Sequence, residues 1–147
     1  MKITQALLAE HVVFHNLFDC LEQTVPKLEM VAEVKVLAAL LESMLKLHSQ
    51  VEDDLLIQPL EPSFCQLGHH ENFHDEHDEI EDHLEQVRAA RTLAKSKREL
   101  LRAVALSRRH FDKEERIVFP LAERQLSAES QKRLGQLWTE QRNLAVV

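Results

Sequence analysis

The stretch RRHFDKEERIVFPL, residues 108–121, decides the fold because it combines helical periodicity with two polar side chains on one face. His110 and Glu114 are four residues apart, which places both side chains on the same side of a helix. The spacing predicts that this side is the buried one. The predicted buried stripe is Ala103, Ser107, His110, Glu114, Ile117 and Leu121. A buried carboxylate is costly unless a partner compensates its charge, so Glu114 requires such a partner.

The same pattern occurs earlier in the chain, within HSQVEDDLL, where His48 precedes Glu52 by four residues. This second pair also lies on a predicted buried stripe of Leu37, Leu41, Met44, His48, Glu52 and Leu55. Imidazole and carboxylate groups are common metal ligands in proteins. Two copies of His-x-x-x-Glu, each facing the core, therefore indicate a shared metal site.

Composition predicts one all-α domain over residues 1–147, because the chain has only two glycines and four prolines and is 44% apolar. The net charge of −7 and the lack of a dominant basic patch argue against a nucleic-acid partner. No apolar run approaches the roughly 18–20 residues of a membrane span, which argues against a membrane partner. The N-terminal sequence lacks the apolar region of a signal peptide, and Cys20 and Cys65 are isolated, so we expect a cytoplasmic location.

Helix signals divide the chain into four long helices and a shorter fifth one. The first is predicted at about residues 4–24, and the second is expected to end near Gln58 because Pro59 follows. Residues 59–68 read as a loop, and a capping-box spacing at residues 96–99 predicts the start of the fourth helix, which runs to about residues 119–120. A short helix is expected from near Ser127. Short connections favour an up-down-up-down four-helix bundle with a short extra C-terminal helix.

The remaining histidines are separated by their position on the helical stripes. The first helix has the stripe Leu7, His11, Phe14, Phe18, Leu21 and Val25. Taken alone, His11 reads as a core histidine bonded to a backbone carbonyl, and His15 as a rim residue or a second-layer group. The third helix holds five of the nine histidines, but its predicted stripe is Phe73, His77, Ile80, Leu84 and Val87. His77 is therefore the candidate ligand, His74 is a weaker one, and the others are expected in solvent: His69, His70 and His83.

A comparison of heights along the bundle changes the interpretation of His11. At about 1.5 Å per residue, antiparallel packing brings six candidate groups to one level, about 10–15 Å from one end. They are His11, His48, Glu52, His77, His110 and Glu114. This number of ligands exceeds what one tetrahedral zinc ion takes and suits two ions, with bridging carboxylates and two imidazoles on each ion. Mixed nitrogen and oxygen ligands favour iron or manganese over magnesium or calcium.

With these motifs, the chain resembles the hemerythrin-like (HHE cation-binding) domain family over nearly its whole length. The resemblance rests on a histidine in the first helix, HSQVE, the pair Glu76–His77, and HFDKE followed by Phe119–Pro120. It implies a four-helix bundle around two iron ions (Fe²⁺/Fe³⁺) with a bridging oxo or hydroxo group, and dioxygen or peroxide as the small ligand. By position, Glu52 and Glu114 resemble the bridging carboxylates. The terminal ligands would be His11, His48, His77 and His110.

Two departures from the oxygen-carrying members bear on function. Those members have His-x-x-x-His on the third helix, where this chain has Phe73 in the first of the two places. They also have His-x-x-x-x-Asp on the fourth helix, where this chain has His-x-x-x-Glu. The missing histidine would leave an extra open position on one iron unless His74 or a water fills it. This departure favours reaction with oxygen or peroxide, or sensing of them, over simple oxygen carriage.

Four functions stay open from the sequence, and it does not decide whether the protein is an enzyme. The chain could bind oxygen for storage or sensing, act as an oxidase or peroxidase, or handle or sense iron. A helical bundle that binds metal adventitiously through its third helix is the fourth reading. Rapid autoxidation and peroxide turnover would favour the enzyme, and metal-dependent stability would favour iron handling.

Aromatic and apolar side chains are expected to keep the site dry. The chain contains no tyrosine, so a tyrosyl radical is not available to it. The residues predicted to line a dry pocket near the metal ions are Phe14, Phe18, Phe73, Phe111 and Ile117.

Overall fold

The computed structural model describes the backbone of residues 1–67 and 70–145 and the side chains of residues 1–63 and 75–143. Helices make up almost all of this described part, and no strand occurs within it. The all-α class predicted from composition is therefore confirmed. Over the same residues, no helix is both long enough and apolar enough to cross a membrane.

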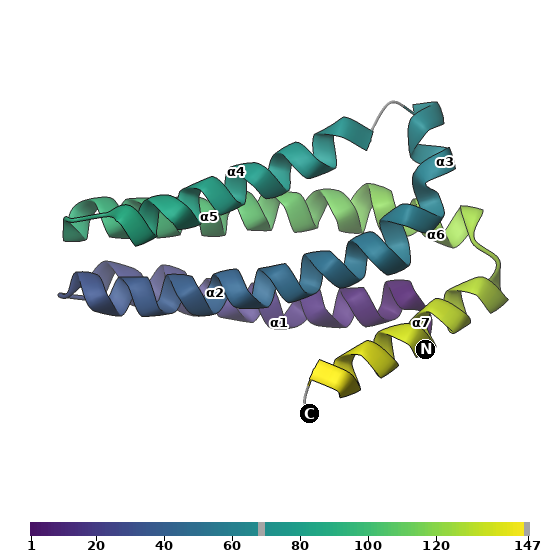
Figure 1. Cartoon of the computed structure of the whole chain (residues 1–147), viewed down its shortest axis with the longest axis horizontal. Coiled ribbons are helices and arrows are strands. Elements are labelled where there is room, and N and C mark those ends of the chain that lie inside the picture. The colour runs from purple at the N-terminus through teal and green to yellow at the C-terminus, as the bar shows by residue number, and fades with distance from the viewer. Residues whose placement is uncertain (68–69, 146–147) are drawn as a thin grey trace.

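Four long helices lie lengthwise in Figure 1, and the colour sequence shows the chain reversing direction from each one to the next. They are α1 (Ile3–Thr24), α2 (Val31–Glu52), α4 (His70–Ala89) and α5 (Leu93–Lys113). The pairs in contact include α4 with α5, α2 with both α4 and α5, and α1 with α5. The 3₁₀ turn η1 (Val25–Lys27) contains Pro26 and follows α1 directly.

Shorter elements gather at one end of the long helices, as Figure 1 shows. They are α3 (Gln58–Leu67), α6 (Phe119–Gln125) and α7 (Ala128–Ala145). The helix α7 begins beside Ser127, as predicted, and packs against α1. The Ser127 hydroxyl accepts a hydrogen bond from the Ser130 amide, which satisfies one of the free donors at the start of this helix.

Two apolar clusters lie at different heights along α1 and α2. One cluster includes Phe14, Phe18 and Leu45, and the other includes Leu7 and Val51. The stripe predicted for α1 is buried at every position, His11 included. His11 in α1 and His48 in α2 lie between the two clusters along their helices. The candidate ligands therefore occupy a polar level between two halves of the hydrophobic core.

Each of the two buried glutamates lies at the start of a π-helical turn or directly before one. The two turns are η2 (Asp53–Ile57), which follows Glu52, and η3 (Glu114–Val118). In η2 the Gln58 amide donates to the Asp53 carbonyl, and in η3 the Phe119 amide donates to the Glu114 carbonyl. A proline comes next in each case, at positions 59 and 120.

The wide turns explain why the loop predicted at residues 59–68 is wrong over residues 59–67, which are helical; residue 68 lies outside the described part. In a regular α-helix the Pro59 ring would collide with the carbonyl four residues earlier and leave it without a donor. A π turn bonds five residues back and widens the helix, so the chain continues past Pro59 into α3. The same turn carries the chain past Pro120 into α6. Proline therefore marks a wide turn here rather than the end of the helix.

The turn η3 also corrects the predicted stripe of the fourth helix. A π turn inserts one extra residue, which rotates the following residues relative to the core. Ile117 is consequently 41% exposed, and its neighbour Val118 is fully buried. Ile117 therefore does not line the dry pocket, contrary to the prediction. Ala103, Ser107, His110, Glu114 and Leu121 are buried as expected.

The start of α5 also differs from the prediction. The N-cap is Thr92, whose hydroxyl accepts a hydrogen bond from the Lys95 amide. Ser96 lies inside the helix, where its hydroxyl donates to the Leu93 carbonyl. The capping-box spacing at residues 96–99 is therefore coincidental, because an equally suitable capping residue precedes it by one turn.

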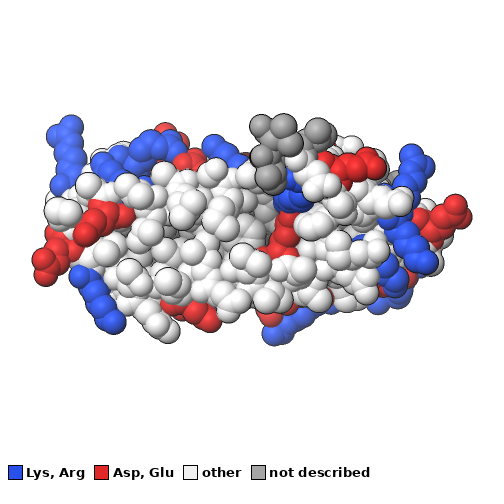
Figure 2. All heavy atoms as spheres, turned by 90° about the horizontal axis from the view of Figure 1, so that it is seen from below, with Lys and Arg blue, Asp and Glu red and all other residues white. Residues whose placement is uncertain are grey.

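Charged side chains on the face shown in Figure 2 lie mostly toward the two ends of the molecule. Basic and acidic groups are interspersed there and along the two long edges, and a neighbouring acidic and basic group also lie near the middle of this face. This face therefore carries no extended patch of one sign.

Candidate metal centre

Six side chains predicted as ligands converge between the two apolar clusters. They form two groups whose potential ligand atoms lie within 4.8 Å of one another. One group is Glu52, His77, His110 and Glu114, and the other is His11, His48 and Glu114. Glu114 belongs to both groups, which is the arrangement required of a carboxylate shared between two ions. That these six side chains bind metal stays a prediction.

The four imidazoles meet in two pairs through their Nε2 atoms. The Nε2 atoms of His11 and His48 are 3.2 Å apart, and those of His77 and His110 are 2.7 Å apart. Two nitrogen ligands held at about 2.1 Å from one ion and at right angles to each other would be about 3.0 Å apart. Each pair therefore has the spacing of neighbouring ligands on one ion.

The carboxylates of Glu52 and Glu114 are fully buried. None of their four oxygen atoms has a hydrogen-bond partner among the described residues. The Nε2 atoms of His110 and His11 lie 2.5 and 3.3 Å from the two oxygens of Glu114, and that of His48 lies 3.9 Å from Glu52, but none of these contacts has hydrogen-bond geometry. Burying a carboxylate is costly unless a proton, an imidazolium or a metal ion compensates its charge. Cations between these oxygens and the imidazoles would remove that cost, so the residues present fit a metal centre.

The pKa values of the two carboxyl groups are shifted in opposite directions. Burial raises the pKa of Glu52 well above its usual value, and the nearby charge of Glu114 raises it further. Burial also acts to raise the pKa of Glu114, but His110 and His11 outweigh it and bring that pKa below the usual value. Burial alone would lower the pKa of His110, but Glu114 and Glu76 raise it to about 9. Without metal, the cluster therefore favours protons on Glu52 and His110, which a cation would displace.

A second layer of carboxylates holds the imidazole rings of His11, His48 and His110 from the outer side. The Nδ1 atom of His48 is 2.7 Å from Glu10, and that of His110 is 2.7 Å from Glu76. The Nδ1 atom of His11 is 3.0 Å from Glu115. Such partners fix the ring orientation and leave Nε2 facing the metal position.

These three glutamates were not predicted as site residues. Each lies next to a predicted ligand in the sequence, as Glu10 does beside His11. However, each contacts a histidine of a different helix. A carboxylate adjacent to a ligand is the available signal, but the sequence alone does not show which ring it reaches.

Comparison with known families finds a cation-binding family, in line with the groups of potential metal ligands. The family described as Hemerythrin HHE cation binding domain matches residues 68–146, more than half of the chain. The chain belongs to this family. The predicted family is thus confirmed by a match over residues 68–146, which contain His77, His110 and Glu114; that the resemblance extends over nearly the whole chain stays a prediction. No curated protein and no solved structure matches the chain.

His15 of this HHE domain joins the second layer and not the group of potential ligands. Its Nε2 atom lies 3.1 Å from the same Glu115 oxygen that contacts His11. His83, which was expected in solvent, is only partly exposed, because its Nδ1 atom contacts Glu99 at 2.7 Å. The predictions for other residues fall on side chains outside the described part: Cys65, His69, His70, Phe73 and His74.

Aromatic rings of the HHE domain cover the imidazoles on the side of the larger apolar cluster. The Phe111 ring stacks on His11 with centroids 4.0 Å apart and nearly parallel planes. The Phe14 ring meets His48 edge-on at 5.3 Å, and Phe18 packs behind Phe14. All three phenylalanines are buried, so they exclude water from this side of the cluster.

Proposed function

We propose that the chain is a non-haem di-iron protein that binds or reacts with dioxygen or peroxide. The observation that carries the proposal is a set of four buried carboxylate oxygens that lie beside two imidazole pairs and have no hydrogen-bond partner within the described part of the chain. In this assignment the four long helices form the predicted up-down-up-down bundle. Each imidazole pair would hold one ion, and Glu114, which belongs to both groups of potential ligands, would be shared between them.

The donor set supports iron over the other common metals. Four imidazoles and two carboxylates suit iron or manganese, whereas magnesium and calcium prefer oxygen ligands alone. A single tetrahedral zinc ion would leave part of the cluster without a partner. Two ions of the same kind account for both pairs and both carboxylates.

Bound iron would supply electrons and Lewis acidity, and the chain's own residues define how these are used. Glu10, Glu76 and Glu115 orient the rings through Nδ1. Phe14 and Phe111 shield the site from water. A dry surrounding strengthens electrostatic interactions within the site and limits proton access.

An oxidase or peroxidase activity is the second candidate, and one observation favours it over storage. His77 is partly exposed, unlike the other three candidate histidine ligands, which are buried. Protons and small substrates can therefore approach one side of the cluster. Sustained turnover needs such access, whereas long-term storage of a bound small ligand is helped by its exclusion.

Cys20 is a free thiol, which supports a reducing compartment such as the cytoplasm.

Purification of the protein from iron-replete cells, followed by elemental analysis and absorption spectroscopy before and after exposure to oxygen, tests the proposal. We expect about two iron ions per chain and oxo-to-iron charge-transfer bands after exposure. Steady consumption of peroxide would select the enzyme over storage. One zinc ion per chain and a colourless protein would overturn the proposal.

A further inference from the structure

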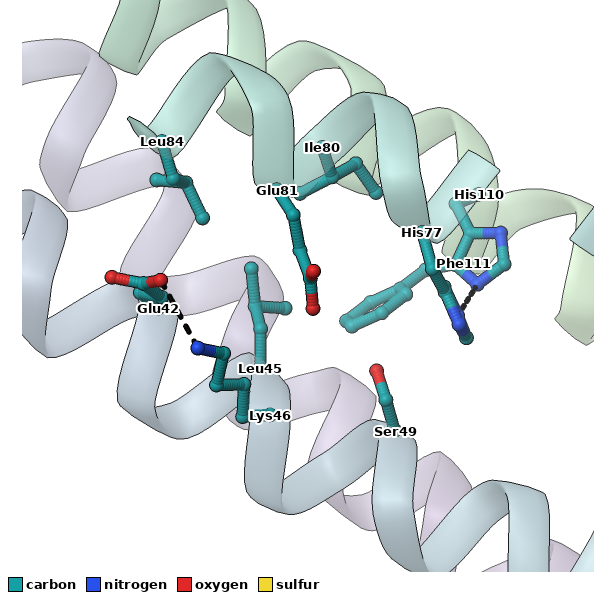
Figure 3. Close-up of a pocket in the computed structure, with 10 residues that line it drawn as sticks. All are labelled: Glu42, Leu45, Lys46, Ser49, His77, Ile80, Glu81, Leu84, His110 and Phe111. Carbon is teal, nitrogen blue, oxygen red and sulfur yellow. Dashed lines mark hydrogen bonds and ion pairs between the residues drawn. The ribbon is translucent and has the colours of Figure 1, made fainter. Parts of the chain in front are cut away.

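A small cavity in the seam between α2 and α4 ends at one of the two imidazole pairs. Figure 3 shows His77 and His110 on one side of this cavity, with the Phe111 ring beside them. Leu45 and Ser49 line it from α2, and other residues complete the lining from both helices: Glu42, Lys46, Ile80, Glu81 and Leu84. The cavity therefore lies between the outside of the seam and the side chains of His77 and His110.

The size of the cavity limits what it can admit. The centre of a water-sized molecule can occupy about 20 Å³ of it. Since one water needs roughly 10–15 Å³ by this measure, the space holds one or two such molecules. Dioxygen, peroxide and azide have two or three heavy atoms and fit this limit, whereas an organic substrate does not.

The chemistry of the walls suits a small ligand with polar ends. Leu45, Ile80 and the Phe111 ring provide apolar surface. Ser49 and Glu81 point into the same space in Figure 3, so hydrogen-bonding groups are present beside the imidazoles. Such groups can contact a ligand or pass a proton to it.

An ion pair at the outer edge of the seam links α2 and α4. Glu42 of α2 is paired with Arg88 of α4 at 2.5 Å and with Lys46 at 3.2 Å. The Glu42–Arg88 pair joins the two helices on the side of the cavity away from His77, whereas Lys46 contacts Glu42 within α2. The cavity therefore lies between this ion pair and the imidazoles of His77 and His110.

A second cavity reaches His48 from the side of the ring that faces Glu10. It is lined by Glu10, Val13, Phe14, Met44, Leu47, His48 and Arg142. Glu10 contacts Nδ1 of His48, whereas Nε2 faces His11 in the cluster. A molecule in this second cavity would meet the Glu10 side of the ring and not the metal position.

We propose that small ligands reach the metal centre through the α2–α4 cavity and bind at the ion held by His77 and His110. The proposal rests on the proposed di-iron function and adds which of the two ions is open to ligands. Ser49 and Glu81 are the residues that contact the incoming ligand. The ion held by His11 and His48 stays closed behind Phe14 and Phe111.

Azide binding to the iron-loaded ferric protein tests this assignment in a stopped-flow experiment that follows the azide-to-iron absorption band. The Ser49→Phe variant should slow azide association by at least about tenfold, because the ring fills space in a close-packed seam. The matched control is Val13→Phe, which fills the second cavity and should stay within about twofold of the wild type. Both variants must carry the wild-type iron content for the comparison.

The opposite change provides a second test if Ser49→Phe does not fold. Leu45→Ala enlarges the cavity and should speed azide association. Unchanged rates in both Ser49→Phe and Leu45→Ala, or a slower rate in Val13→Phe alone, would overturn the access route while leaving the di-iron function intact. A wild-type protein without iron would overturn both.

Discussion

Glu114 is a buried carboxylate that lies close to both imidazole pairs. It is fully buried, shared by both groups of potential ligands, and located at the first residue of a π turn. His110 approaches one of its oxygens at 2.5 Å and His11 approaches the other at 3.3 Å. No apolar replacement could serve both imidazole pairs. The carboxylate charge is therefore the property for which this residue is needed.

The Glu114→Gln variant isolates that charge, because glutamine keeps the shape of the side chain. We expect its iron content to fall from about two ions per chain to less than about one, since both ions lose an anionic ligand. Elemental analysis of the purified variant measures the effect. Glu129→Gln, at an exposed position in α7, is the control and should keep the wild-type content. Retention of two iron ions by Glu114→Gln would show that this carboxylate does not bridge.

His110 makes the stability of the metal-free protein depend on pH. Its pKa is raised from 6.5 to about 9, so the folded state binds its proton more tightly than the unfolded state does. This contribution is fully present below pH 6.5 and is lost as the pH rises through about 9. The raised pKa of Glu52 acts in the same direction. The lowered pKa of Glu114 affects stability only at acid pH, outside this window.

Denaturant unfolding of the metal-free protein at several pH values tests this coupling. The free energy of unfolding should fall by at least about 1 kcal/mol between pH 6.5 and 9. The iron-loaded protein should lack this decrease, because cations replace the protons. A metal-free stability that stays constant or rises over this window would contradict the assigned protonation.

At the scale of elements, α7 is connected to the metal centre through a chain of side chains. Arg142 and Trp138 both donate to the same oxygen of Glu10, at 2.7 and 2.9 Å. The other oxygen of Glu10 contacts Nδ1 of His48. Arg142 also donates to the Leu47 carbonyl of α2. The last helix therefore holds a second-layer carboxylate in place for a ligand of α2.

The Arg142→Met variant tests the contribution of α7 to metal retention. Loss of the guanidinium frees Glu10 to turn away from His48, so iron should leave faster. We expect release to a chelator to be about two- to tenfold faster, measured by the absorbance of the iron–chelator complex. Arg133→Met, at an exposed site in the same helix, should release iron at the wild-type rate. Equal rates in all three proteins would show that α7 does not support the site.

Helical periodicity was sufficient to predict the burial of His11, His48 and Glu114, because each continues an apolar stripe. It failed at Ile117 and at residues 59–67 for one shared reason. Both lie at or beyond a π turn before a proline, and the extra residue in such a turn is not visible in the pattern. The contacts of Glu10, Glu76 and Glu115 were not predictable either, because they depend on which helices become neighbours.

At the scale of the whole molecule, the polar level divides the hydrophobic core into two clusters. One cluster contains Phe18 and Leu100, and the other contains Ile3 and Leu60. Each cluster can stabilise the helices by apolar burial alone. The level between them contributes buried carboxylates, which oppose folding unless they are compensated. The buried carboxylates therefore lower the free energy of unfolding of the metal-free protein, and two bound cations would raise it.

Anaerobic titration of the metal-free protein with ferrous iron, followed by circular dichroism of the metal bands, tests this central claim most directly. The account predicts a linear rise that ends at about two iron ions per chain, with both imidazole pairs filled. An end point at one ion per chain, or a signal that never saturates, would contradict it.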